Sequence, residues 1–130
     1  MMFAKFKNKN QSFFGLPGNP ISSAACFRFF VYPYLRLILN MKSEKPFKAK
    51  LKYNYFKKKN FTKFLKSKIG VNKKGILEVE VLKGQESFRI KSFTEANSWA
   101  LFNSGKSTFK KGELIDCFPP VDYQQNFLSK

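Results

Sequence analysis

The sequence predicts an α+β fold: a strand, a rigid turn and a helix, followed by a small, mostly antiparallel β-barrel. Three observations lead to this class. Residues 15–20 place two glycines and two prolines between an apolar pair and a long apolar segment. Residues 47–55 alternate between apolar and polar side chains, which is the pattern of a half-buried strand. Short extended segments separated by tight turns follow, as in small barrels and sandwiches.

The turn at residues 15–20 favours a strand that ends and a helix that begins directly after it. Gly15 and Gly18 permit positive φ and a close approach of the backbone to another group. Pro17 fixes φ and removes an amide donor. The same residues are also compatible with a rigid connection that binds nothing, because turns of this composition are common.

The helix after the turn has a favourable start. Asn19 is a good N-cap, and Pro20 then occupies the first helical position, where proline is preferred. Ser22 lies in the first turn, beside backbone N–H groups that we expect to be free and to attract an anion such as phosphate. We expect the helix to cover residues 20–32, with Pro33 ending or kinking it.

Residues 21–39 are apolar and long enough to raise the question of a membrane span. Arg28 and Arg36 lie inside this segment, and each costs about 2.5–3.5 kcal/mol near the centre of a bilayer. We therefore expect a buried helix of a soluble domain and no membrane partner.

The pattern divides the chain into three parts. Residues 1–43 hold the turn and the helix, residues 44–120 form the barrel, and residues 121–130 are an irregular tail. Beyond the strand at residues 47–55, we expect extended segments at residues 62–71, 77–81, 99–102 and 113–118.

Two local signals mark the connections inside the barrel. Residues 72–75 form a hairpin loop, with Gly75 where positive φ is expected. Ser92 and Glu95 have the spacing of a capping box, which predicts a short helical turn at residues 92–95.

The composition restricts the chemistry. Histidine is absent, which removes the commonest general base and the commonest metal ligand. Cys26 and Cys117 are far apart in the sequence and form no metal-binding pair, and they fit a reducing cytoplasm. We therefore expect no catalytic residue and no metal ligand in this chain, and a cytoplasmic location.

The net charge of +17 is concentrated in residues 42–74, a segment that begins at Lys42 and ends at Lys74. It holds thirteen lysines and a single acid, Glu44. A basic face can bind nucleic acid. Lysines outnumber arginines by 22 to 3, however, and sites that read bases favour arginine. A solvated lysine face is the other interpretation, and it makes a nucleic-acid partner the less favoured one.

Several segments carry a resemblance to a known family. Residues 14–23 read FGLPGNPISS, and the apolar helix follows through FVYPYLR at residues 30–36. This element resembles the molybdopterin molybdenumtransferases, the MoeA-type enzymes related to the E domain of gephyrin. Weaker similarities follow in the same order along the chain, at residues 61–66, 85–87, 92–97 and 110–115.

The resemblance implies an activity and partners. These enzymes insert molybdate into adenylylated molybdopterin (molybdopterin-AMP), release AMP and form molybdenum cofactor with a divalent cation such as Mg²⁺. Their catalytic domain is α/β, their C-terminal domain is a small β-barrel, and the active site lies between the two. The family forms homodimers.

The resemblance also implies a set of substrate-binding residues. The turn would supply one wall of the pocket, through Pro17 and Pro20 above all. The family's pocket-facing arginine on the barrel corresponds to Lys66, and its serine corresponds to Ser87. With the rest of the turn and the start of the helix, the predicted set is Gly15, Pro17, Gly18, Asn19, Pro20, Ser22, Lys66 and Ser87.

The sequence departs from the family's pattern in three places. Lys66 loses the bidentate fork of an arginine but keeps its charge. Glu86 stands where a glycine is usual. The family's acidic residues, which hold the cation, precede the turn and have no counterpart among residues 1–14. We therefore expect the C-terminal third of an enzyme, from a truncated or a split reading frame, which is inactive without the missing N-terminal half.

Overall fold

The computed structural model describes residues 1–86 and 89–121. It divides the chain into two compact units, Met1–Ser43 and Glu44–Lys130. The expected irregular tail lies outside the described residues, except for Val121. No helix in the described part of the chain has both the length and the apolar character that crossing a bilayer requires.

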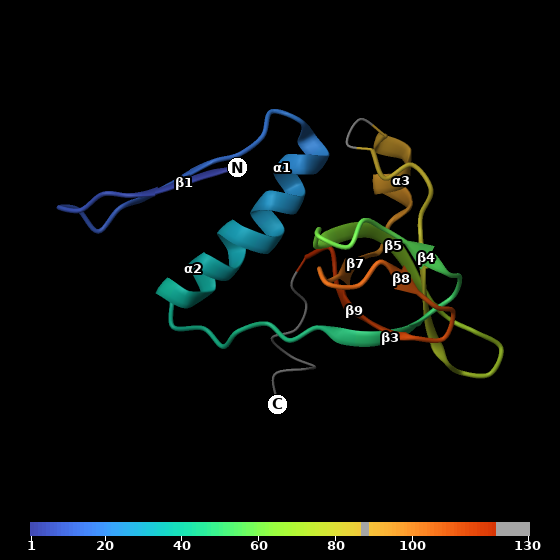
Figure 1. Cartoon of the computed structure of the whole chain (residues 1–130). Coiled ribbons are helices and arrows are strands. Elements are labelled where there is room, and N and C mark those ends of the chain that lie inside the picture. Colours follow the sequence, from blue (N-terminus) through green and yellow to red (C-terminus); the bar gives the residue numbers. More distant parts are fainter. Residues whose placement is uncertain (87–88, 122–130) are drawn as a thin grey trace. The chain divides into compact units, whose positions relative to one another are not determined.

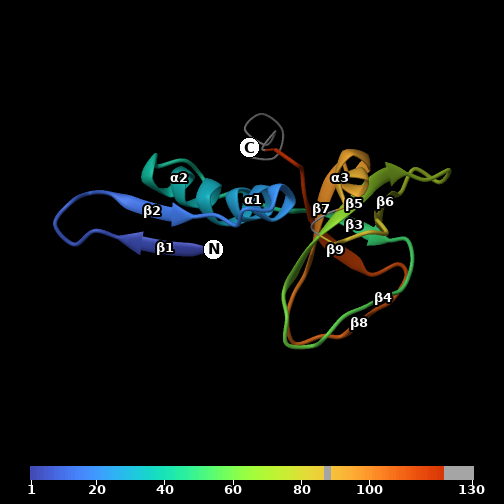
Figure 2. The same ribbon diagram turned by 90° about the horizontal axis from the view of Figure 1, so that it is seen from above.

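The first unit is a β-hairpin followed by a helical rod (Figure 1). Strands β1 (Met2–Lys5) and β2 (Ser12–Gly15) pair in antiparallel register, and Figure 2 shows them side by side. The rings of Phe3 and Phe14, one from each strand, lie 4.9 Å apart. Both contact the ring of Tyr34, at 5.7 and 5.2 Å, so the aromatic side chains hold the hairpin on the rod.

The rod is longer than the sequence predicts. It consists of α1 (Pro20–Cys26), a π-helical stretch η1 (Phe27–Val31) and α2 (Tyr32–Ile38). Pro33 was expected to end or kink the helix at residue 32, and the first alternative was wrong because the helix continues to Ile38. Within η1 the N–H of Tyr32 donates to the carbonyl of Phe27, five residues back, and this wider turn directly precedes Pro33. A proline lacks the N–H and crowds the preceding turn, so a local π-turn lets the rod continue through it.

The rod ends in a Schellman motif at Asn40, which adopts the left-handed φ of 54°. The N–H of Met41 donates to the carbonyl of Arg36 at 2.9 Å, and the N–H of Asn40 donates to that of Leu37 at 3.2 Å. The buried guanidinium of Arg36 also donates to the carbonyl of Lys42, which fixes the chain as it leaves the helix.

The second unit contains a closed five-stranded barrel in the order β3-β6-β5-β7-β9, and Figure 2 labels these strands. Only β3 and β6 pair in parallel, so the expectation of a mostly antiparallel barrel is confirmed. The strands are β3 (Phe47–Leu51), β5 (Lys63–Val71), β6 (Leu77–Val81), β7 (Ser98–Phe102) and β9 (Leu114–Phe118).

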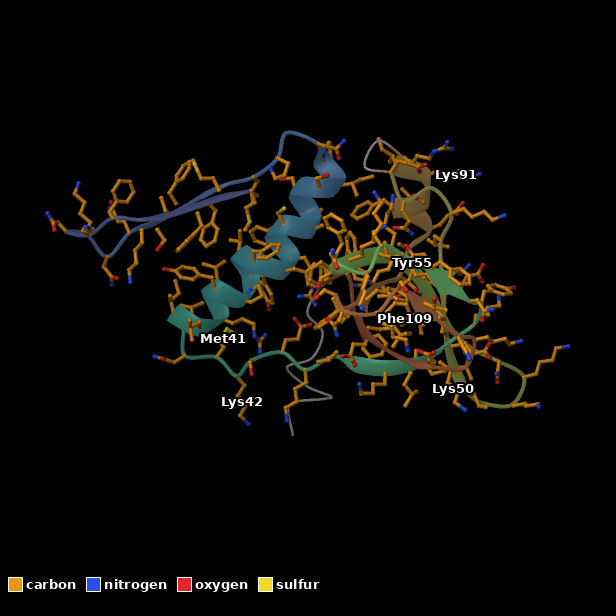
Figure 3. The ribbon with its side chains drawn as sticks, in the orientation of Figure 1. Met41, Lys42, Lys50, Tyr55, Lys91 and Phe109 are labelled. Carbon is orange, nitrogen blue, oxygen red and sulfur yellow. The ribbon has the colours of Figure 1, made fainter. Side chains whose placement is uncertain are left out.

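The strand predicted at residues 47–55 is divided in two. After β3 the chain leaves the barrel and forms β4 (Tyr55–Phe56), which pairs with β8 (Thr108–Phe109) in a separate ribbon. Phe102 of β7 is fully buried, and its ring lies 4.7 Å from Tyr55 and 4.8 Å from Phe109. Figure 3 labels these two ribbon residues. The ribbon therefore covers the barrel core with aromatic side chains, which explains why the pattern of alternation continues across the break.

The core follows the alternation of the strands. Inward positions are buried or partly buried, while Lys50, on β3, points outward to solvent (Figure 3). The buried cluster consists of Ala49, Leu51, Leu65, Val79, Ala100, Phe102, Phe109, Ile115 and Cys117.

The connection between β6 and β7 contains α3 (Ile90–Glu95). A short helix was expected here and is present, but its start was wrong by two residues. The N-cap is Arg89 and makes no side-chain capping bond, whereas Ser92 lies inside the first turn and is buried. The Ser92 hydroxyl is used for tertiary contacts instead, which are described below.

Candidate functional site

The turn at residues 15–20 positions the helix start through Asn19. Asn19 has extended backbone geometry (φ −75°, ψ 127°), and its Oδ1 accepts from the N–H of Ile21 at 3.1 Å and of Ser22 at 3.3 Å. Its carbonyl accepts from the N–H of Ser23 at 2.8 Å. The predicted N-cap and the proline at the first helical position are confirmed.

The same bonds overturn one expectation. Pro20 has no N–H, and the N–H groups of the next three residues already donate to Asn19. The first turn therefore has no free backbone donor for an anion, contrary to the expectation at Ser22. Any ligand contact of Ser22 would depend on its half-buried side chain.

The two glycines of the turn have different surroundings. Neither glycine has positive φ, so the turn does not use the left-handed backbone conformation that glycine permits. A Cβ on Gly15 would lie 3.4 Å from Cβ of Met2 on the paired strand, which is a close contact. A Cβ on Gly18 would meet no atom within 4 Å. Pro17 is half-buried and Pro20 is exposed, so both predicted pocket prolines have surface available.

On the barrel, the predicted site residue Lys66 is enclosed. Lys66 lies on strand β5 and is 1% exposed. Its Nζ donates to the Ser92 hydroxyl at 2.7 Å and to the Gly84 carbonyl at 2.8 Å, with the carbonyls of Glu86 and Arg89 at 3.3 and 3.4 Å. Burial lowers the pKa of Lys66, and the Glu86 carboxylate acts against that shift. A ligand would reach this ammonium only by displacing these internal partners.

Two side-chain amides fasten the connection around α3 to β5. Gln85 accepts from the N–H of Lys66 at 2.9 Å and donates to the carbonyls of Lys66 and Leu82, both at 2.7 Å. Asn97 accepts from the N–H of Ile69 at 2.7 Å and donates to its carbonyl at 2.9 Å. Each side-chain amide bonds to the backbone of β5 as a neighbouring strand would, at a position that β6 or β7 does not reach.

Sequence reasoning identified the segments that contain Gln85, Ser92 and Asn97 but not these roles. The available signal was their polar character inside segments that resemble the family.

Ser87, the last predicted site residue, lies outside the described residues. Glu86, which replaces a glycine of the family pattern, forms an exposed ion pair with Arg89 at 3.4 Å. The turn residues and Lys66 belong to different units, Met1–Ser43 and Glu44–Lys130.

The lysine-rich segment is not a uniform solvated face. Lys57 is buried, and its Nζ donates to the carbonyls of Lys106 at 2.7 Å and Phe61 at 2.8 Å. Burial lowers its pKa, with a further contribution from the charge of Lys63. Other lysines of the segment pair with acids that lie outside it: Lys48 with Asp116 and Lys52 with Glu80.

A groove of about 560 Å³ lies on the hairpin of β5 and β6. Its lining contains both basic and acidic side chains, among them Lys68 and Glu78, and it includes the ion pair of Lys52 with Glu80 at 2.7 Å. This mixture favours no single sign of ligand. The described residues contain no group of three acidic, histidine or cysteine side chains that could hold a metal ion. They do not fit the Mg²⁺ that the resemblance implies.

The comparisons with known proteins place this barrel in a protein family of molybdenum cofactor synthesis. The model of the MoeA C-terminal region (domain IV) matches residues 48–119, more than half of the chain. The chain therefore belongs to the MoeA family, and its second unit is the C-terminal region of that family.

A curated relative extends the similarity beyond the barrel. The molybdopterin molybdenumtransferase of Haemophilus influenzae is 27% identical over 123 residues, which is 90% of this chain and 30% of that protein. The chain thus spans about a third of the length of this relative.

Proposed function

We propose that this chain acts as the C-terminal portion of a molybdopterin molybdenumtransferase. In that role it contributes the turn at residues 15–20 and the barrel to the pocket for adenylylated molybdopterin. The observation that carries the proposal is the similarity to the Haemophilus influenzae transferase, which covers 90% of the chain and therefore extends beyond the barrel.

The structure supports a rigid binding wall in the first unit. Two proline rings, a capped helix start and the pairing of Gly15 with Met2 of the neighbouring strand limit the motion of this turn. A preorganised surface loses little conformational entropy when it binds a ligand. In the proposal, Pro17, Gly18 and Pro20 supply contact surface, and Ser22 supplies a hydroxyl.

The reaction proposed for the whole enzyme is insertion of molybdate into adenylylated molybdopterin with release of AMP. The dependence on Mg²⁺, the homodimer and the cytoplasmic location are part of this proposal. Because the described residues contain no group of three acidic, histidine or cysteine side chains, the proposal assigns the Mg²⁺ to none of them. We expect the 130-residue chain alone to release no AMP and to bind the substrate weakly.

A chimera tests the proposal. The segment of the Haemophilus influenzae transferase that aligns with this chain is replaced by the chain itself, and molybdate-dependent AMP release is measured. The truncated relative without any replacement is the negative control. We expect the chimera to recover activity that the truncated protein lacks. A folded chimera that fails to bind adenylylated molybdopterin would refute the proposal.

A pair of variants within the chimera locates the contact. Pro17→Ala is expected to raise KM for adenylylated molybdopterin, because Pro17 lies in the proposed wall. Lys50→Ala removes an exposed side chain on β3 and is expected to leave KM unchanged. Equal effects of the two variants would contradict the assignment of the turn.

Nucleic-acid binding through residues 42–74 is the competing proposal. The structure gives it less support than the composition does, because Lys57 and Lys66 are buried and others pair with acids. Binding driven by phosphates weakens steeply with salt. Absence of affinity for a generic duplex at low salt would exclude this function.

A further inference from the structure

The ammonium of Lys66 occupies an unusual position for a charged group. Lys66 lies on β5, between β6 and β7 in the closed barrel, and is 1% exposed. Among the described residues it forms no ion pair with a carboxylate within 4 Å. A buried charge without a partner is costly, so its stabilisation must come from the neutral oxygen atoms around it.

Four oxygen atoms surround Nζ, and they come from one short stretch of chain. The nearest are the Ser92 hydroxyl at 2.7 Å and the Gly84 carbonyl at 2.8 Å. The Glu86 and Arg89 carbonyls complete the set at 3.3 and 3.4 Å. An ammonium has three protons, so two short bonds and one shared longer contact satisfy it fully.

The oxygen atoms are held in place by contacts that do not involve the Lys66 side chain. The Ser92 hydroxyl lies 2.5 Å from the Gly84 carbonyl and 2.9 Å from the Arg89 carbonyl, and it donates its proton to one of them. Gly84 has φ +75°, and a Cβ there would lie 3.0 Å from the Arg89 side chain. The side chain of Gln85, which lies between Gly84 and Glu86 in the sequence, makes two hydrogen bonds to the backbone of Lys66 on β5 and one to the Leu82 carbonyl. The oxygen atoms therefore converge because the connection itself is folded that way.

We propose that the oxygen atoms of Gly84, Glu86, Arg89 and Ser92 form a monovalent-cation cage, which the ammonium of Lys66 fills as a tethered cation. Converging carbonyl oxygens replace the hydration shell of K⁺ in selective channels, and NH₄⁺ has the charge and the N–H donors of the lysine head group. In this chain the cation is covalently attached, so it fastens the connection between β6 and β7 to β5 permanently. This inference does not depend on the proposed transferase function.

Lys57 shows the same arrangement a second time. Its Nζ donates to the carbonyls of Phe61 and Lys106, with the carbonyl of Lys58 at 3.4 Å and the Phe109 ring centroid at 5.6 Å. The side chain is buried, and it joins the two connections that flank the β4–β8 ribbon. The barrel therefore uses two lysines of the basic segment as internal cations.

Cation rescue tests the cage directly. Lys66→Ala leaves the four oxygen atoms without their cation, and the midpoint of thermal unfolding is expected to fall by about 10 °C in choline chloride. Replacing choline by NH₄⁺ or K⁺ at equal ionic strength should recover a substantial part of this loss. The wild-type chain and Lys68→Ala, an exposed lysine on the same strand, should show no such difference. Equal midpoints of Lys66→Ala in the three salts would overturn the cage.

A second measurement uses the wild-type chain and does not require the variant to fold. A pulse of an amine-acetylating reagent is followed by mass spectrometry of each lysine. We expect Lys66 and Lys57 to react about tenfold or more slowly than Lys68, because the reagent must wait for local opening. Burial lowers the pKa of both lysines, and a lower pKa by itself would make an amine react faster. Slow acetylation would therefore show that the reagent cannot reach the two amines. Acetylation of Lys66 at the rate of Lys68 would overturn the proposal.

Discussion

Substitution of Gln85 tests how the connection around α3 is held on the barrel. In Gln85→Ala, three hydrogen bonds of 2.7–2.9 Å are lost, two to Lys66 and one to Leu82. Each net hydrogen bond contributes about 0.5–1.5 kcal/mol, and the N–H of Lys66 would lose its acceptor on a buried strand. We therefore expect the free energy of unfolding to fall by about 3 kcal/mol.

Urea unfolding followed by tryptophan fluorescence measures this loss. The single tryptophan, Trp99, is buried on β7, so its emission reports the barrel. With a slope of about 2 kcal/mol per molar urea, the midpoint should fall by about 1.5 M. The matched control is Lys83→Ala, two residues earlier and exposed, which should shift the midpoint by less than about 0.25 M.

A near-isosteric variant separates size from hydrogen bonding. Gln85→Glu keeps the acceptor for the N–H of Lys66 but places an oxygen against the carbonyls of Lys66 and Leu82, to which Gln85 donates. We expect a loss at least as large as that of Gln85→Ala at neutral pH. If both Gln85 variants unfold at the midpoint of Lys83→Ala, the reasoning about these hydrogen bonds is refuted.

Three further predictions concern other parts of the chain. Asn19→Ala removes the cap of α1 and should cost about 1 kcal/mol of helix stability, whereas Asn19→Ser should retain most of it, as measured by circular dichroism. Burial raises the pKa of Cys117 to about 12, so at pH 8 a thiol reagent should modify only the partly exposed Cys26 until the chain is denatured; equal rates would contradict this. Phe102→Ala removes the ring that lies between those of Tyr55 and Phe109, and the free energy of unfolding should fall by about 3–5 kcal/mol in the same urea assay. A loss below about 1 kcal/mol would show that the ribbon does not cover the core.

Local sequence signals predicted local structure well. The hairpin loop with Gly75 has φ +76° as expected, and the strand at residues 77–81 is β6. The N-cap at Asn19 was predicted because its side chain reaches only the next residues of the same chain. Such signals succeed because the interacting atoms are close in sequence.

The wrong predictions share a cause: a contact with residues distant in the sequence, or an unusual backbone conformation, outweighed the local signal. Ser92 looked like a helix cap, but its hydroxyl contacts Lys66, 26 residues earlier. The strand at residues 47–55 is divided because Tyr55 pairs with Phe109, 54 residues later, by backbone register. The helix continues through Pro33 because a π-turn precedes it, and no residue type predicts such a turn.

The sequence by itself determined the fold class, the capped helix start and the family, because periodicity, turn chemistry and a specific motif are properties of neighbouring residues. It also located the excess of positive charge. Only the tertiary structure decided what those charges do. Lys66 and Lys57 are enclosed by carbonyl oxygens, while Lys48 and Lys52 pair with acids of other strands. A lysine's role depends on which oxygen atoms the closed barrel brings to its ammonium, and most of these lie 18 or more residues away in the chain.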